Sequence, residues 1–384
     1  MRRNRGRAMI RLGVSAVLGV LVAFAAPVQA IETAAKQVIV VEFDTGAVLY
    51  AKDADAVMYP ASMTKMMTIY LLFERLKNGS LSLEDKFPVS ETAWRKGGSK
   101  MFVKVGDRVT VEDLVRGIVV QSGNDATIVV AEGIAGSESA FAEMMTEKAR
   151  VIGMTNTVFR NASGWPDPEH VTTARDLAIL AERTIRDFPE LYHYYSEVTF
   201  TYNKIKQGNR NPLLYKDMGA DGLKTGHTEA SGYGLTASAK RKDRRLVVVA
   251  NGFGSVKARA GGSERLIDWG FRAWNNYALF DGGETVADAQ VWLGSAETVP
   301  IVIKDPLVVT IPRKARSKLK VAVTYDEPVP APIAKGARIA TLVVSAPEAE
   351  TIELPLYAGA DVPQLGPVGR LGEALRYLVW GGKF

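Results

Sequence analysis

The chain has 384 residues, no cysteine and a formal net charge of +6. The lack of cysteine excludes disulfide bonds and cysteine-based zinc sites. The three histidines, His170, His193 and His227, lie far apart in the sequence and form no H-x-x-x-H pair. The sequence therefore predicts neither a metal ion nor another cofactor.

Residues 1–30 have the layout of a secretory signal peptide. Five arginines precede an apolar run, and Val28-Gln29-Ala30 supplies the small residues that a signal peptidase recognises. The alternative is an uncleaved N-terminal anchor, but the apolar stretch is short for a span of ~20 residues. Removing this segment leaves the chain near +1, which excludes a basic nucleic-acid-binding surface. The sequence therefore predicts an exported protein that does not bind nucleic acid.

Residues 31–283 are predicted to form a mixed α/β domain, with an antiparallel sheet and helices on both faces. Apolar runs on either side of Asp44-Thr45-Gly46 indicate a hairpin over residues 37–51. A helical pattern follows from Pro60 to Asn78-Gly79, and mostly helical and loop sequence continues to about residue 190.

The last part of this domain returns to strands. The stretch 221–239 reads as a strand entered through a tight turn, with Lys224-Thr225-Gly226 near its start. Strands are predicted over 232–239 and 245–251, separated by a charged turn, and a helix is predicted over 263–274.

Residues 284–362 are predicted to form a small all-β domain, either a sandwich or a barrel. Apolar side chains alternate over 319–325 and over 352–356, so each run places them on one face of a strand. Residues 363–384 are predicted to be an amphipathic helix. This helix could pack on the β-domain or lie in a membrane surface, and its terminal position with Trp380 and nearby cations favours the membrane.

Ser62-Met63-Thr64-Lys65 forms an S-x-x-K motif at the predicted helix start. Pro60 places Ser62 in the first turn, and a spacing of three puts Lys65 on the same helical face. A neutral amine there could take the proton of the hydroxyl, which requires a lysine pKa ~3 units below its usual ~10.4. The alternative is a capping serine followed by a solvated lysine. A second match, Ser317–Lys320, lies on a predicted strand where residues three apart face opposite sides, so it is set aside.

Lys224-Thr225-Gly226 offers a cation, a hydroxyl and a position without a side chain. Lys224 at a sheet edge could face Lys65 and disfavour its charge, while Thr225 could bind a carboxylate. Gly226 would let an extended substrate lie along the strand. The backbone N–H of His227 would then stabilise an oxyanion together with that of Ser62. The alternative is an ordinary charged turn before a strand.

Ser122-Gly123-Asn124 forms an S-x-N motif between two apolar segments predicted to be buried helices. In this position Ser122 could pass a proton to a leaving group, and Asn124 could hold a substrate amide. The alternative is a plain helix–helix turn.

The three motifs follow one another with gaps of 60 and 102 residues, behind a signal peptide. This set is found in penicillin-binding proteins and class A β-lactamases. With the stretches "PASMTKMMT", "SGNDA", "GNRNPLL" and "DGLKTGHTEASGYGL", the sequence resembles the low-molecular-mass penicillin-binding proteins. These are serine-type D-Ala-D-Ala carboxypeptidases, typified by penicillin-binding proteins 5 and 6. The resemblance covers nearly the whole mature chain, including a C-terminal β-domain and an amphipathic anchor.

The resemblance implies a transpeptidase-like catalytic domain that removes the terminal D-Ala from peptidoglycan stem peptides and is acylated by β-lactams. Ser62 would form the acyl-enzyme and Lys65 would take its proton. Ser122 and Lys224 would relay a proton to the departing D-alanine, and Asn124 would position the peptide.

The resemblance also implies how the substrate is held and where the protein works. Thr225 would meet the terminal carboxylate, helped by Arg259 and Arg210. The enzyme would act on the periplasmic side of the cytoplasmic membrane, attached to the membrane surface by residues 363–384.

Three other functions are open. A D,D-endopeptidase acting on peptidoglycan cross-links would use the same residues. A β-lactamase of class A would need a glutamate in an E-x-x-L-N setting, and no glutamate in this chain has Leu and Asn at those positions. A non-catalytic membrane-surface binding protein is disfavoured by the intact Ser62, Lys65 and Lys224.

Overall fold

The structure is a computed structural model that describes residues 7–11 and 31–372. It divides into two compact units, Ile31–Arg272 and a second unit that contains the chain from Ala273 together with residues 7–11. Most of the predicted signal peptide, and the predicted C-terminal helix from residue 373, lie outside the described residues.

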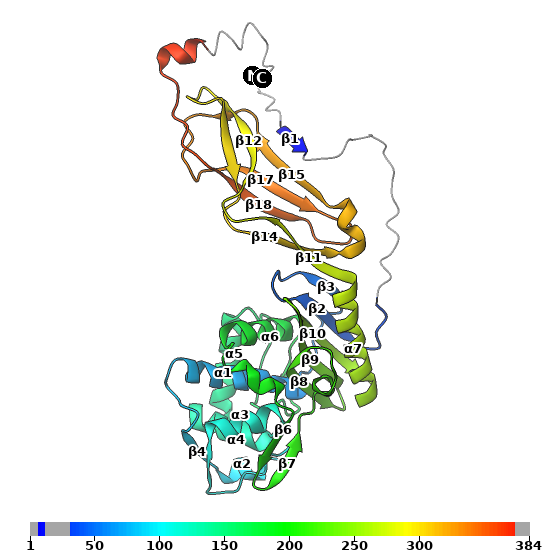
Figure 1. Ribbon diagram of the computed structural model, residues 1–384. Helices are drawn as coiled ribbons and strands as arrows, with labels where there is room; N and C mark the ends of the chain where they lie inside the picture. Colours follow the sequence, from blue (N-terminus) through cyan, green and yellow to red (C-terminus); the bar gives the residue numbers. More distant parts are fainter. Residues whose placement is uncertain (1–6, 12–30, 373–384) are drawn as a thin grey trace. The chain divides into compact units, whose positions relative to one another are not determined.

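The first unit is built on a five-stranded sheet in which every neighbouring pair is antiparallel (Figure 1). In spatial order the strands are β3 (Val48–Lys52), β2 (Gln37–Glu42), β10 (Arg244–Phe253), β9 (Gly232–Arg241) and β8 (Ala220–Thr228). The predicted hairpin over 37–51 is confirmed as β2 and β3, and the predicted strands over 232–239 and 245–251 as β9 and β10. The strand β8 lies at the edge of the sheet.

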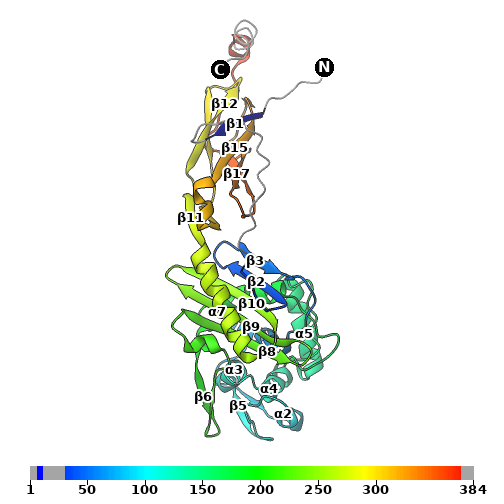
Figure 2. The same ribbon diagram turned by 90° about the vertical axis from the view of Figure 1, so that its right-hand side faces the viewer.

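Helices cover both faces of this sheet, as predicted. One face packs against α7 (Val256–Ala273), where a Cβ on Gly270 would meet Leu246 at 2.7 Å (Figure 2). The other face packs against α6 (Ala174–Asp187), and Val247 and Val249 point into the core on that side. The apolar run of β10 is continuous because both of its faces are buried.

The remaining helices form a layer around one central helix, α1 (Lys65–Lys77) (Figure 1). Nine consecutive residues of this helix, from Lys65 to Phe73, are buried, and it packs against α3, α4, α5 and α6. The layer consists of η1 (Ala61–Thr64), α1 (Lys65–Lys77), α2 (Glu91–Arg95), α3 (Val111–Val119), α4 (Asn124–Ala135), α5 (Glu138–Val151), η2 (Tyr192–Ser196) and η3 (Pro212–Tyr215). Two small ribbons accompany it, β4 (Lys86–Pro88) with β5 (Arg108–Thr110) and β6 (Thr199–Tyr202) with β7 (Ile205–Gly208).

The second unit is all-β, as predicted. Its larger sheet has the order β1 (Arg7–Arg11), β15 (Lys320–Asp326), β17 (Arg338–Ser345), β18 (Ile352–Ala358), β13 (Thr298–Val302), β12 (Thr285–Trp292), β16 (Val329–Pro330). A ribbon of β11 (Trp274–Phe280) and β14 (Leu307–Pro312) shares its apolar core. The strand β1 lies within the predicted signal peptide, so its pairing with β15 exists only in a chain that keeps its first thirty residues.

Four details differ from the sequence prediction. Residues 221–239 form two strands joined by a turn, so Lys224-Thr225-Gly226 lies in the middle of β8. The helix predicted from residue 263 begins at Val256. The division between the units falls at Arg272, not near residue 283, because β11 already pairs with β14. In the second S-x-x-K match, Ser317 lies in the 3-10 turn η4 (Arg313–Lys318) and not on a strand.

Helix α4, which begins in the S-x-N motif, packs closely against β4 because Gly133 has no side chain. A Cβ on Gly133 would lie 2.5 Å from ring carbons of Phe87, so Gly133→Ala should destabilise the fold by ~1–3 kcal/mol. The matched control is Gly261→Ala in α7, where the new methyl meets only Arg265 at 3.5 Å. Because alanine is the better helix former, that change should stabilise by ~0.5–1 kcal/mol. Urea unfolding measures the change in unfolding free energy for each variant. Equal changes in the two variants would contradict the close packing of Gly133 on Phe87.

Candidate active site

Ser62 and Lys65 form the centre of the site. Ser62 lies half-buried in η1, one 3-10 turn before α1 begins at Lys65. The Lys65 Nζ lies 2.9 Å from Ser62 Oγ and donates a hydrogen bond of 2.6 Å to the backbone carbonyl oxygen of Ser163. The Lys65 side chain is fully buried. The predicted pairing of hydroxyl and amine is therefore present, and the alternative of a solvated lysine is excluded.

The pKa of Lys65 lies well below its usual value. Burial is the largest cause, followed by the charges of Lys224, Arg210 and Lys96, while Asp125 acts in the opposite direction. The predicted effect of Lys224 therefore has the right sign, although burial outweighs it. This shift favours the neutral amine, whose lone pair can accept the Ser62 proton.

A loop that follows α5 closes over Lys65. Asn161 Oδ1 accepts hydrogen bonds from the backbone N–H groups of Gly164 and Trp165, at 2.8 and 2.9 Å, which turns the Ser163 carbonyl oxygen toward the amine. Gly164 has φ +79°, and a Cβ there would overlap the Ala61 carbonyl oxygen of η1. The sequence prediction missed this loop, whose only sequence signal is the turn-forming run Asn161–Gly164.

The same loop reaches α1 through His170. Burial lowers the pKa of His170 to about 4, so the ring is neutral at pH 7. Its Nδ1 accepts a hydrogen bond from the Arg160 N–H at 3.1 Å, which leaves Nε2 to donate to Thr64 Oγ1 at 2.8 Å. His170 therefore ties the loop to the serine turn without adding charge.

The edge strand β8 brings Lys224 and Thr225 to the serine turn. A Cβ on Gly226 would lie 2.7 Å from the Pro60 carbonyl oxygen, so η1 packs directly on β8 at this residue. The missing side chain is thus required by packing within the protein, while the predicted contact with a substrate backbone stays a prediction. Lys224 and Thr225 are both buried, at 2% and 5% exposure. Burial, with the charges of Arg210 and Arg259, lowers the pKa of Lys224 to about 7.

The S-x-N motif lies between α3 and α4, as predicted. Ser122 has φ +68°, and its buried hydroxyl has no hydrogen-bond partner within the described residues. Asn124 begins α4 and donates from Nδ2 to the Gly97 carbonyl oxygen at 2.9 Å. The next residue, Asp125, binds the backbone N–H groups of residues 101–103 and acts on the pKa of Lys65. Ser122 therefore has an unpartnered buried hydroxyl in the turn that leads into α4.

Two arginines add positive charge to the site. Arg210 is held by its neighbours, since Asn211 Nδ2 donates to the Gly222 carbonyl oxygen of β8 at 2.9 Å. Arg259 in α7 is 6% exposed, and its Nε has no partner within the described residues. The Arg259 Cζ lies over the Tyr233 ring, 5.8 Å from its centroid. The exposed His227 ring stacks on the same tyrosine ring, with the two centroids 3.9 Å apart.

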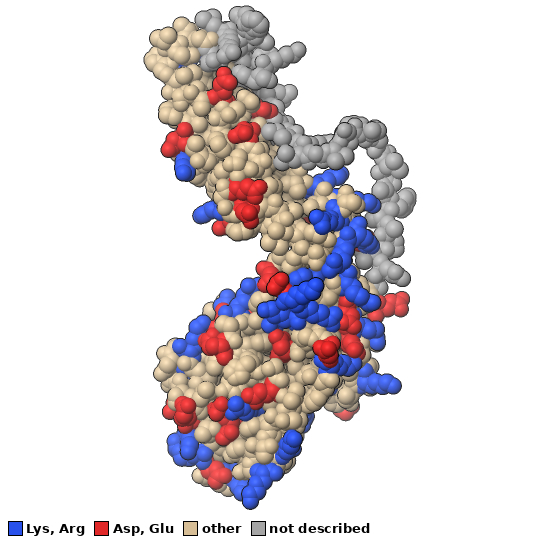
Figure 3. All heavy atoms as spheres, viewed as in Figure 1, with Lys and Arg blue, Asp and Glu red and all other residues tan. Residues whose placement is uncertain are grey.

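The positive charge of the site is not a property of the whole surface. Lysine and arginine are interspersed with acidic side chains over much of the visible face of the first unit (Figure 3). The cations that act on Lys65 and Lys224 instead converge on a region where those two lysines are buried. Within residues 7–11 and 31–372, no three acidic or histidine side chains gather into a metal-binding cluster.

Comparisons with known proteins agree over nearly the whole chain. The Peptidase S11 family, described as "D-alanyl-D-alanine carboxypeptidase", matches residues 23–253. The family described as "Penicillin-binding protein 5, C-terminal domain" matches residues 274–364. The D-alanyl-D-alanine carboxypeptidase DacA of Haemophilus influenzae is 37% identical over 353 residues, 90% of each chain. DacC of Escherichia coli is 37% identical over 374 residues, 94% of each chain.

Solved structures agree as well. Penicillin-binding protein 5 of Haemophilus influenzae matches with a TM-score of 0.78 and 37% identity, over 88% of this chain and 100% of that one. Penicillin-binding protein D2 of Listeria monocytogenes, in its ampicillin-bound form, matches with a TM-score of 0.58 and 30% identity, over 63% of this chain and 98% of that one.

The lowered pKa of Lys224 predicts that this lysine destabilises the fold. The unfolded chain binds the proton with a pKa near 10.5 and the folded chain with a pKa of about 7, so the full cost applies below pH 7 and fades as the pH rises to 10.5. Lys224→Met should therefore raise the unfolding free energy at pH 7 by roughly 1–4 kcal/mol. The gain should shrink toward pH 10.

Urea unfolding at a series of pH values measures this difference directly. Lys240→Met is the matched control, because Lys240 is exposed near the end of the neighbouring strand β9, and its effect should stay within about 0.5 kcal/mol. A gain for Lys224→Met that does not depend on pH would show that Lys224 is not the titrating group.

Proposed function

Because the chain belongs to the Peptidase S11 family of D-alanyl-D-alanine carboxypeptidases, we propose that it removes the terminal D-alanine from peptidoglycan stem peptides through an acyl-enzyme on Ser62. The observation that supports this most directly is the Lys65 amine, which is buried, has a pKa well below its usual value and lies 2.9 Å from Ser62 Oγ. A serine is a weak nucleophile until a base takes its proton, and this geometry supplies the base.

The acylation step would begin with the Ser62 hydroxyl and the Lys65 amine. The lone pair of Lys65 Nζ takes the Ser62 proton while Oγ attacks the carbonyl carbon between the two D-alanines. Negative charge then develops on the carbonyl oxygen, where the backbone N–H groups of Ser62 and His227 would stabilise it. As the C–N bond breaks, the departing D-alanine nitrogen needs a proton. The unpartnered Ser122 hydroxyl, with Lys224, would deliver it.

The second half of the reaction regenerates the enzyme. First, the proton that Lys65 took would pass to the Ser122–Lys224 pair and replace the one given to the D-alanine nitrogen. A water molecule would then attack the ester carbonyl of the acyl-enzyme and give a proton to the neutral Lys65, which would return it to Ser62 Oγ as the Oγ–C bond breaks. A β-lactam would acylate Ser62 in the same way. The Listeria relative of known structure has been solved in an ampicillin-bound form, which supports β-lactams as ligands of this site.

The cations explain why a free C-terminal carboxylate would be required. Lys224, Arg210 and Arg259 lower one another's pKa or that of Lys65, because their like charges lie close together and Lys224 and Arg259 are buried. A substrate carboxylate next to Thr225 would relieve this repulsion, and an arginine fork suits a carboxylate. Asn124 would hold the peptide amide, and Gly226 with His227 would border the bound backbone.

We extend the proposal to the location of the enzyme. Removal of residues 1–30 as a signal peptide would place it on the periplasmic side of the cytoplasmic membrane. An amphipathic helix toward the C terminus would attach it to the membrane surface. Residues 363–365 still pair with the β-domain, since the Leu365 N–H binds the Leu293 carbonyl oxygen at 2.9 Å, and helical structure begins at residue 367. No helix in the described ranges has the length and apolarity that a membrane crossing needs.

The acyl-enzyme proposal is tested with a fluorescent penicillin. Ser62→Ala should abolish both stable labelling and release of D-alanine from a peptide ending in D-Ala-D-Ala, because Ser62 supplies the one side-chain hydroxyl that is hydrogen-bonded to Lys65 Nζ in the described part of the chain. Ser317→Ala is the matched control, since it removes the serine of the other S-x-x-K match and should change neither. Labelling of Ser62→Ala would overturn the assignment, and rapid loss of the label from the wild type would favour a β-lactamase.

The anchor is tested by truncation after Gly366, which spares the paired residues 363–365. The truncated enzyme should move from the membrane fraction to the soluble fraction after cell breakage. Its rate of reaction with penicillin should stay within about twofold, because the site lies wholly in the other unit. Equal partition of the truncated and full-length proteins would contradict a C-terminal anchor.

A further inference from the structure

The β-domain has a long strand edge that the signal-peptide region covers. Its larger sheet ends in β16 on one side, while on the other side β15 is followed only by β1 (Figure 1). Because β1 lies within residues 1–30, the proposed removal of these residues makes β15 the edge of the sheet. The outward N–H and C=O groups of β15 then have no strand partner within residues 31–372.

The two edges of this sheet differ in their ability to accept another strand. The strand β16 has two residues and includes Pro330, which has no N–H to donate. The strand β15 has seven residues, Lys320–Asp326, with neither proline nor glycine among them. Three of the seven are β-branched, which suits an extended backbone. The edge at β15 therefore lacks the features that usually prevent strand addition.

The side chains of β15 alternate between the core and the outer face of the sheet. Val323 and Tyr325 are 1% and 5% exposed, and Val321 packs against the same apolar core. Lys320 and Asp326 are exposed on the outer face, one at each end of the strand. Neither forms an ion pair with another described residue. The strand thus carries an unpaired cation at its start and an unpaired anion at its end.

This charge pattern is complementary to itself. When two copies of β15 run antiparallel with Val323 opposite Val323, Lys320 of each copy lies opposite Asp326 of the other. Val321 then lies opposite Tyr325, so the apolar face of the sheet continues from one copy to the next. A slip of two residues separates both ion pairs, and a slip of one residue turns the apolar side chains outward. One register therefore satisfies both faces.

The pairing of β1 with β15 follows the same pattern. Five residues of β1 run antiparallel to β15, so this edge accepts an antiparallel strand. Arg7 occupies the register position opposite Asp326, which Lys320 of a second copy would occupy in the arrangement described above. A basic residue thus stands opposite Asp326 in both pairings.

We propose that mature chains form a two-fold symmetric dimer by antiparallel pairing of β15 with β15 of a second copy. The sheet then continues across the two β-domains, with a Lys320–Asp326 ion pair at each end of the shared ladder. A single strand pair gives an interface below about 1,200 Å², so the dimer is weak in solution. Attachment of both copies to one membrane surface would favour it by raising their effective concentration. The dimer does not depend on the proposed carboxypeptidase activity.

The test is sedimentation of the mature chain, residues 31–384, and of two charge-reversal variants, over about 1–500 μM, where an interface of this size should dissociate. Lys320→Asp places two carboxylates opposite each other at both ends of the ladder, and Asp326→Lys places two ammonium groups there. Each variant alone should raise the dissociation constant about tenfold, because like charges directly opposite destabilise a strand pair. An equimolar mixture of the two variants should dimerise as well as the wild type, because opposite charges then face each other at both ends.

Glu353→Lys is the matched control. It changes the charge as much as Asp326→Lys does and is exposed, but it lies on β18, between β17 and β13, where no second copy can pair. It should dimerise like the wild type. Recovery of the dimer in the mixture shows that both charge-reversal variants are folded. A wild type that stays monomeric, single variants that dimerise as it does, or a mixture that stays monomeric would each overturn the proposal. None of these results would affect the proposed activity, because the active site lies in the other unit.

Discussion

The site depends on keeping one lysine amine buried and uncharged against a serine hydroxyl. Among the described residues, the Lys65 amine forms hydrogen bonds with Ser62 Oγ and the Ser163 carbonyl oxygen, and the cations around it oppose its protonation. Exclusion of water keeps such an amine neutral, and it is provided by the buried first nine residues of α1. It also explains the two close approaches to the serine turn, one from Gly226 on β8 and one from Gly164 on the covering loop. The environment of the catalytic pair therefore depends on the same packing that forms the core of the first unit.

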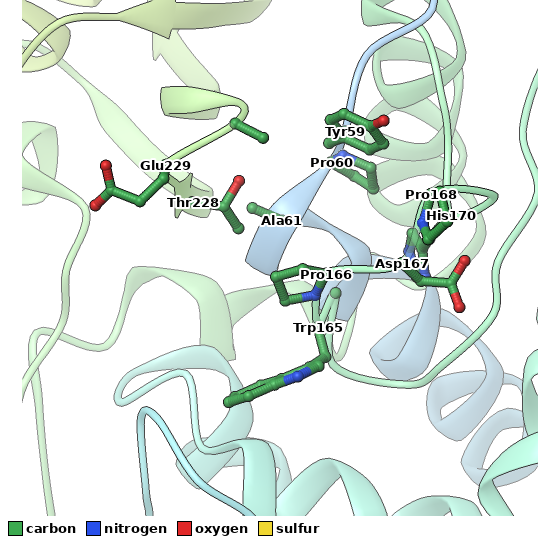
Figure 4. Close-up of a pocket in the computed structure, with 12 residues that line it drawn as sticks. Tyr59, Pro60, Ala61, Trp165, Pro166, Asp167, Pro168, His170, Thr228 and Glu229 are labelled. Carbon is green, nitrogen blue, oxygen red and sulfur yellow. The ribbon is translucent and has the colours of Figure 1, made fainter.

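Charge is distributed unevenly on the two sides of the nucleophile. Lys224, Arg210 and Arg259 lie on one side, and burial or mutual repulsion lowers the pKa of each. Asp167 and Glu229 border a cavity of about 430 Å³ on the other side (Figure 4), without ion pairs in the described part of the chain. A terminal carboxylate held by the cations would place the scissile carbonyl at Ser62 through charges that do not take part in bond breaking.

The sequence predicted those features that depend on local spacing. The S-x-x-K pair, the hairpin over 37–51 and the helix–turn–helix around Ser122 follow from residues a few positions apart. Contacts between distant segments could not be predicted this way: the Ser163 carbonyl oxygen, the Asp125 loop and the packing of Gly226 on Pro60 all join segments far apart in sequence. The boundary between the units was misplaced because α7 passes into β11 without a turn signal. The Gly282-Gly283 turn, which does give such a signal, lies inside the second unit.

The reactive geometry is stabilised by its surroundings and not by local preference. Ala61 and Ser122, beside or at reactive serines, have φ values of +48° and +68°, which non-glycine residues adopt at a cost of roughly 1–3 kcal/mol each. The buried lysines add a further cost, and the Ser122 hydroxyl is unsatisfied in the described structure. These costs are tolerable because η1 and the Ser122 turn are each followed directly by a helix whose first eight or more residues are buried. A site with this much unfavourable local energy would relax in a smaller domain, so the large apolar core around α1 is a requirement of the chemistry as well as of the fold.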